Sequence, residues 1–153
     1  MKKLLITVLG PCALVGLGTI GIVWWDRGAP PGFDPTPVPV AFDALTRAHR
    51  GVRVKGTAHY AVRLKQKMEG GEMFTLFPLL AHEDVMGREI KVLVRTQRFP
   101  ENLVTYENLV VDGLARPPGR LVGPEIREAL EEGGYHFSDN YVLIETFEDW
   151  APE

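Results

Sequence analysis

Apolar residues follow two different patterns along this chain. From Leu4 to Trp25 they run for 22 residues without a charged side chain, whereas after Val40 short apolar stretches alternate with polar positions. An α-helix rises about 1.5 Å per residue, so the first run is long enough to cross the roughly 30 Å hydrocarbon core of a bilayer. The second pattern is typical of half-buried strands. The sequence therefore predicts a single N-terminal transmembrane helix followed by a small β-rich domain.

Five stretches of the domain have the alternation or the β-branched composition of strands. Gly56 would permit a bulge or a sharp bend in the first of them. Two short helices are also expected, the second with a proline in its first turn and two glycines after its end. This pattern predicts a mainly β fold, a five-stranded Greek-key β-barrel of the OB (oligonucleotide/oligosaccharide-binding) class. The expected strands are 52–64, 73–80, 89–96, 109–115 and 137–147, and the expected helices are 42–49 and 124–132.

The flanks of the apolar run predict its orientation. Lys2 and Lys3 precede it, and the positive-inside preference keeps that end in the cytoplasm. We expect the apolar run to be retained as an anchor rather than cleaved as a signal peptide. It is longer than the apolar region of a signal peptide, which has roughly 7 to 15 residues, and no A-x-A cleavage site follows it. We expect residues 1–26 to form a cytoplasmic stub and the anchor. Residues 27–40 contain five prolines and should form an extended tether, and residues 41–153 should form an extracytoplasmic domain. The expected location is the cell inner membrane, with the domain in the periplasm.

Charge and cysteine content exclude several classes of protein. The formal net charge of -3 gives no general attraction for nucleic acid. The single cysteine, Cys12, lies in the expected anchor, so the domain has neither a disulfide nor a cysteine-based metal site. Between Ala41 and Lys67 there are seven basic residues and one acid, while acids dominate the C-terminal part. These regions are either two solvated faces or a docking surface for a charged partner.

Two stretches of the chain resemble cytochrome c maturation protein E, a family of membrane-anchored periplasmic haem chaperones with an OB-fold domain. The segment from Pro100 to Gly113 keeps the proline, an acid, the apolar pair Val110-Val111 and the last glycine of the family's P-D-x-F-x-x-G-x-G-V-V-x-x-G pattern. Tyr106 and Asn108 replace two of its glycines. The last expected strand keeps apolar positions of the pattern F-x-A-x-x-V-L-A-K-H-D-E-x-Y, including Phe137, Val142 and Leu143.

The departures from this family concern its haem-binding residues. In the family the motif's histidine bonds covalently to a haem vinyl group and its tyrosine can ligate the iron, and here Thr146 and Trp150 occupy those two positions. A threonine hydroxyl is a poor nucleophile without an activating base, and indole offers only an N–H donor. We therefore expect neither position to function as it does in the family, and any haem to be bound non-covalently. The candidate residues for contact with haem or with a partner are His136, Tyr141, Arg53, Lys55 and Tyr60. For His136 and Tyr141 the alternative is a strand-entry histidine and a surface or barrel tyrosine.

No motif in the chain predicts an enzyme. His49, His59 and His82 lack metal-ligand spacing and are interpreted as surface or loop residues. One hypothesis is a membrane-anchored protein for haem handling or cytochrome c assembly, with haem as the one candidate cofactor and other maturation membrane proteins as partners. The alternative is a membrane-tethered protein-interaction or assembly module that never binds haem. A third is an unrelated small β-domain with a similar glycine pattern.

Overall fold

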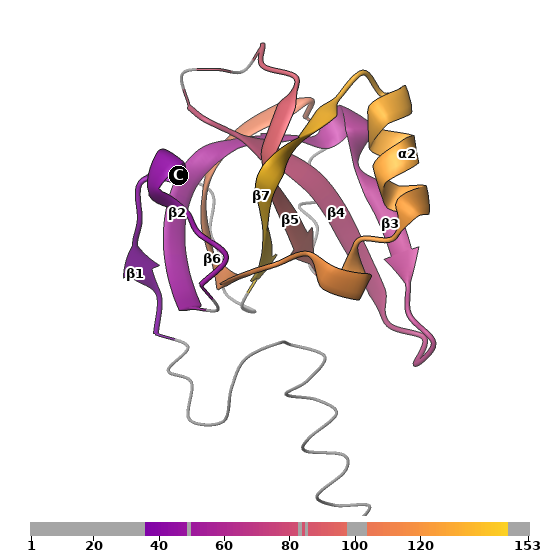
Figure 1. The fold of residues 1–153 in the computed structure, drawn as a ribbon, viewed down its shortest axis with the longest axis horizontal. Coiled ribbons are helices and arrows are strands. Elements are labelled where there is room, and N and C mark those ends of the chain that lie inside the picture. Colours follow the sequence, from indigo (N-terminus) through magenta and orange to yellow (C-terminus); the bar gives the residue numbers. More distant parts are fainter. Residues whose placement is uncertain (1–35, 49, 83, 85, 98–103, 147–153) are drawn as a thin grey trace, which may run out of the picture. The chain divides into compact units, whose positions relative to one another are not determined.

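A computed structural model describes residues 36–48, 50–82, 84, 86–97 and 104–146 (Figure 1). The chain divides into two units, Met1–Phe33 and Asp34–Glu153, and every described residue belongs to the second. Within these residues no helix combines the length and the apolar character that a membrane crossing requires. The expected anchor, most of the expected tether and Trp150 lie outside the described residues.

The described part of the chain contains seven strands, one α-helix and three short 3-10 turns. Five long strands lie at the predicted positions, and the helix predicted at 124–132 is confirmed. The elements are β1 (Val38–Pro39), η1 (Phe42–Ala44), β2 (Arg50–His59), η2 (Tyr60–Val62), β3 (Leu64–Lys67), β4 (Met73–Leu80), β5 (Glu89–Thr96), β6 (Tyr106–Arg116), η3 (Gly119–Leu121), α2 (Pro124–Glu132) and β7 (His136–Thr146).

The helix predicted at 42–49 is wrong. Only the turn η1 forms there, and Leu45 already has extended backbone angles, φ -65° and ψ 136°. Phe42 and Leu45 instead pack against the barrel core from this irregular segment. Just before it, β1 pairs in parallel with the start of β2, and the Val40 amide donates to the Arg53 carbonyl at 2.9 Å.

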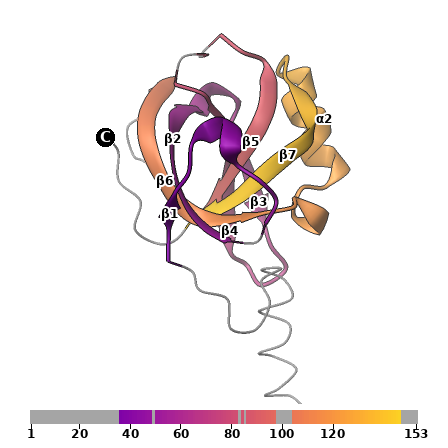
Figure 2. The same ribbon diagram turned by 60° about the vertical axis from the view of Figure 1, so that its left-hand side comes forward.

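The five long strands close into a barrel with OB-like strand order (Figures 1 and 2). Around the barrel the order is β2, β6, β7, β5 and β4, and β4 returns to β2. The β5–β7 pair is parallel and the other four are antiparallel. Closure is short, because β2 and β4 pair only through Thr57 with Leu80 and Ala58 with Leu79. The predicted five-stranded barrel is therefore confirmed.

The first predicted strand, 52–64, is interrupted. Both β2 and β3 pair with β4, but seven steps along the chain from Thr57 to Leu64 correspond to only four steps along β4, from Leu80 to Leu76. The turn η2 supplies the three extra residues. Gly56 does not interrupt the β2–β6 ladder, but a Cβ at this position would lie 2.7 Å from Leu79 Cγ and 2.8 Å from the Leu80 carbonyl oxygen. Its lack of a side chain therefore permits the close approach of β4 where the barrel closes.

Two apolar cores lie on opposite faces of the barrel strands. The first fills the barrel and includes Val54, Phe77 and Ile144. The second lies on the outer face of β4, β5 and β7, where Leu76 and Leu93 cluster with Leu130 of α2. Figures 1 and 2 both show α2 on the outside of the barrel. The helix thus covers one outer face of the sheet and leaves the interior to strand residues.

Candidate functional site

The face that binds ligands in many OB folds is filled here by the chain itself. That face consists of the second and third barrel strands with the adjacent loops, which in this barrel are β4 and β5. The segment between β6 and β7 lays Leu121, Ile126 and Leu130 over it, and all three side chains are buried. A ligand or partner of the native fold must therefore use another surface.

The two positions that match the family's haem-binding residues give no ligand site within the described residues. Thr146 is the last residue of β7, is partly buried, and pairs with Gly113 of β6. A Cβ at Gly113 would collide with the Glu145 carbonyl oxygen and with Ile144 Cγ2, so the two strands cross here at very short range. Trp150 lies outside the described residues.

His136 and Tyr141 are separated although both belong to β7. His136 is exposed at the start of the strand, where its amide donates to the Arg88 carbonyl at 2.9 Å. Tyr141 is buried in the outer core beside Phe137, with ring centroids 4.7 Å apart. The guanidinium of Arg47 lies 5.7 Å from the Tyr141 ring centroid. Burial raises the pKa of the Tyr141 hydroxyl.

The basic first strand places its predicted contact residues on different faces. Arg53 points outward and forms two bonds with Asp112, of 2.8 and 2.5 Å, and the hydrogen bond with Asp112 raises the pKa of Arg53. Lys55 is exposed, two residues further along. Tyr60 is fully buried in the barrel core, and its hydroxyl donates to Glu107 at 2.8 Å. Burial, reinforced by Glu107, raises the Tyr60 pKa. Its ring is therefore unavailable to a surface ligand.

A cluster that sequence reasoning missed lies where β2 ends. His59, interpreted from the sequence as a surface or loop residue, is only 5% exposed. Its ring stacks on Tyr106, with centroids 4.3 Å apart and planes 15° apart, and its Nδ1 is hydrogen-bonded to the buried Tyr135 hydroxyl. Arg88 donates to the same hydroxyl at 3.2 Å. We refer to His59, Arg88, Tyr106 and Tyr135 as the aromatic–arginine cluster.

The hydrogen bonds in this cluster favour a neutral histidine. Because the Tyr135 oxygen accepts from Arg88, its own proton is available for Nδ1 of His59. Burial, and then the positive charge of Arg88, lower the pKa of His59. The contacts of Arg88 with Tyr106 and Tyr135 raise its own pKa. When Nδ1 accepts this hydrogen bond, the neutral imidazole carries its proton on Nε2 and has no free lone pair for a ligand. Its ring stacks on the inner face of Tyr106.

The exposed residues of the cluster and their exposed neighbours in the sequence have the composition of a protein-binding surface. Tyr106 is 39% exposed, and Val104, two residues earlier, is also exposed. Met86, two residues before Arg88 on the loop between β4 and β5, is 76% exposed. Tyrosine, methionine and arginine are the residue types enriched at interface centres. The only sequence signal for this site was Tyr106, in place of a glycine of the family pattern.

A second polar cluster joins the ends of three barrel strands. Glu145 of β7 accepts from Arg95 of β5 at 2.6 Å and from Arg116 of β6 at 2.7 Å. Arg95 also donates to Gln66 at 3.1 Å and lies 3.4 Å from the centroid of the Phe74 ring. The Arg95 side chain is 4% exposed and that of Glu145 is 18% exposed. These buried contacts hold the ends of the strands together.

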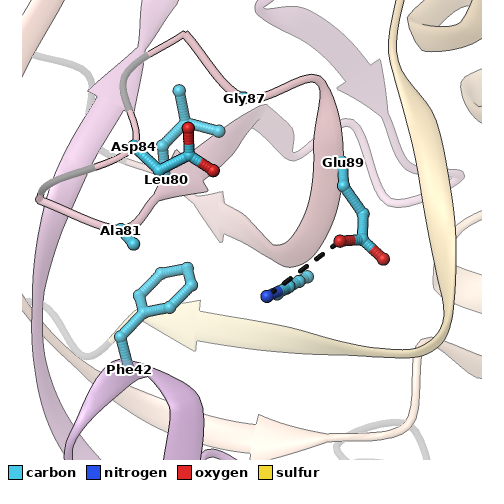
Figure 3. A pocket seen from close by; sticks show the side chains of 7 residues that line it. Phe42, Leu80, Ala81, Asp84, Gly87 and Glu89 are labelled. Atoms are coloured by element: carbon cyan, nitrogen blue, oxygen red, sulfur yellow. Dashed lines mark ion pairs between the residues drawn. The ribbon is translucent and has the colours of Figure 1, made fainter.

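A pocket beside the loop between β4 and β5 is too small for an organic ligand (Figure 3). Its volume of about 30 Å³ accommodates a water molecule. Glu89 lines it and lies 4.0 Å from Lys91, an exposed ion pair. The described residues also contain no group of three histidine, cysteine, aspartate or glutamate side chains that could hold a metal ion. The residues lining the pocket are Phe42, Leu80, Ala81, Asp84, Gly87, Glu89 and Lys91.

Comparison of the chain with protein-family models, curated proteins and solved structures finds no significant match.

Proposed function

We propose that this chain is a membrane-tethered, extracytoplasmic binding module that docks a protein partner on the aromatic–arginine cluster. The observation that carries the proposal is the exposed Tyr106 ring, fixed from behind by His59 and beside Arg88. A ring held in one orientation loses little conformational entropy on binding, which is how aromatic residues anchor interfaces. The covering of the β4–β5 face by α2 supports a site elsewhere on the barrel. The tether and the anchor are inferred from the sequence alone.

Site-specific photocrosslinking in intact membranes tests this proposal. A photoreactive phenylalanine analogue at Met86 should give a discrete adduct with one protein. The same analogue at Val38, an exposed apolar residue of β1, provides the matched control and should give none. Adducts of equal yield from both positions, or none from either, would refute the proposal.

Two substitutions at Tyr106 refine the test. Tyr106→Ala removes the anchoring ring and should weaken partner binding about thirtyfold, the effect of losing an interface hot spot of about 2 kcal/mol. Tyr106→Phe keeps the ring and should change binding less than threefold, or about 0.7 kcal/mol. If both variants bind as the parent chain does, the partner does not use this surface.

Non-covalent haem binding is the second candidate. It is favoured by the OB-like barrel and by the exposed Tyr106, because a tyrosine side chain can ligate haem iron. Here Tyr106→Phe separates the two functions, since it removes the iron ligand and keeps the docking ring. A saturable shift of the haem absorbance on titration of the full-length chain, lost in Tyr106→Phe, would support haem binding. The absence of such a shift would refute haem binding.

A further inference from the structure

The second open surface of this domain is the edge of the sheet formed by β3. In the described sheet β3 is one of the two terminal strands, the other being the two-residue β1, and β3 pairs only with β4. The Met68 amide donates to the Glu72 carbonyl at 2.9 Å, which marks residues 68 and 72 as a hydrogen-bonded pair of the antiparallel ladder. Such pairs alternate along a ladder. The backbone groups of Gln66 therefore point toward β4, and those of Lys65 and Lys67 point away from it.

This edge is open and positively charged. Lys65 and Lys67 are both exposed, and neither forms an ion pair with any described residue. Arg63 precedes them, so three of five consecutive residues are cationic. The acids of the following turn, Glu69 and Glu72, make no ion pair with them. An edge of this kind repels a second copy of itself, which limits self-association.

We propose that β3 binds an extended acidic segment of a partner protein by strand addition. Backbone groups of the added strand would pair with the outward N–H and C=O groups of Lys65 and Lys67, and its carboxylates would lie opposite their ammonium groups. The same two lysines that disfavour pairing between copies thus select an acidic strand. This surface is independent of the aromatic–arginine cluster.

Nuclear magnetic resonance titration of the full-length chain in detergent tests the proposal. The probe is an eight-residue peptide of alternating glutamate and valine, and the control is its lysine–valine counterpart. The acidic peptide should shift the amide signals of Lys65 and Lys67 saturably and leave that of Tyr106 unchanged. The basic peptide should shift none of them. If the acidic peptide gives no saturable shift at about millimolar concentration, the proposal is overturned.

Two sets of variants distinguish strand addition from simple charge attraction. The double variant Lys65→Glu/Lys67→Glu should bind the acidic peptide at least about tenfold more weakly, because two attractive pairs become repulsive. Lys67→Pro removes both the ammonium group and the outward backbone N–H. Lys67→Ala removes the ammonium group but keeps the backbone N–H. The proline variant should bind about fivefold more weakly than the alanine variant, the effect of one hydrogen bond.

The peptide itself provides a readout that does not depend on the folding of a variant. Methylation of its backbone nitrogens keeps its carboxylates and removes its donors, so binding to the unmodified chain should be lost. Equal binding of the methylated and unmethylated peptides would refute strand addition. Because Tyr106 and Met86 take no part, this experiment can fail while the docking surface around them stands.

Discussion

Replacing Glu145 by glutamine should destabilise the domain by about 3 kcal/mol. The carboxylate lies between Arg95 and Arg116 at 2.6 and 2.7 Å, and their side chains are only 4% and 9% exposed. Breaking a buried ion pair by removing one partner costs about 3 to 5 kcal/mol, because the remaining charge stays in a poorly solvated site. We take the lower end, since Glu145 is 18% exposed and glutamine retains a hydrogen-bond acceptor.

Urea denaturation of the full-length chain, followed by intrinsic fluorescence, measures this change. At about 3 kcal/mol the thermal midpoint should also fall by roughly 10 °C for a domain of this size. The matched control is Asp112→Asn, whose partner Arg53 has a side chain 54% exposed. The Asp112 side chain is itself only 11% exposed, but the charge left unpaired is that of Arg53, which remains solvated, so this substitution should destabilise the domain much less than Glu145→Gln. If the two substitutions have equal effects, burial does not strengthen the Glu145 contacts and the reasoning fails.

Two further predictions concern the outer core and the buried histidine. Leu130→Ala in α2 should lower the free energy of unfolding by about 2 to 5 kcal/mol, because Leu130 is fully buried on the β4–β5 face. The control is Glu128→Ala, which replaces an exposed residue of the same helix and should change the free energy of unfolding by less than about 0.5 kcal/mol. Comparable losses from both substitutions would mean that α2 does not pack on the barrel. The pKa of His59 is lowered from 6.5 by burial and by Arg88, so its contribution to stability is present above pH 6.5 and is lost as the pH falls through the folded-state pKa. The urea midpoint should therefore decrease on acidification in the parent chain and decrease less in His59→Asn, and an identical pH dependence in both would contradict the assignment.

The alternation of apolar residues predicted the strands because burial on one face imposes a period of two. It could not predict η2, since Ala58, Tyr60, Val62 and Leu64 continue the same period across the interruption. In the structure Tyr60 enters the barrel core, whereas Val62 and Leu64 pack against the outer core. One continuous sequence pattern thus supplies side chains to two different cores. The switch from the barrel core to the outer core is revealed only by the three extra residues that η2 adds relative to β4.

The candidate site depended on contacts that no local pattern encodes. His59 and Tyr135 are hydrogen-bonded although 76 positions separate them. The strand pattern places His59 on the outer face of β2, which predicts exposure unless another segment covers it. Tyr135, which follows α2, is that cover. Tyr106 is paired directly with His59 in the β2–β6 ladder. This contact could have been predicted from the sequence only if the register of β2 against β6 had been known.

The basic region between Ala41 and Lys67 had two interpretations, a solvated face or a docking surface, and the structure divides it by position. Its first part is used within the domain, since Arg47 donates to the Tyr141 and Asp139 carbonyls and Arg53 binds Asp112. Its last part lies beyond η2, on a strand that pairs on one side only. Lys65 and Lys67 therefore combine charge with outward backbone groups, whereas Arg47 and Arg53 form intramolecular bonds. An acidic partner is expected to be selected by β3, and charge reversal at Arg53 should leave its binding unchanged.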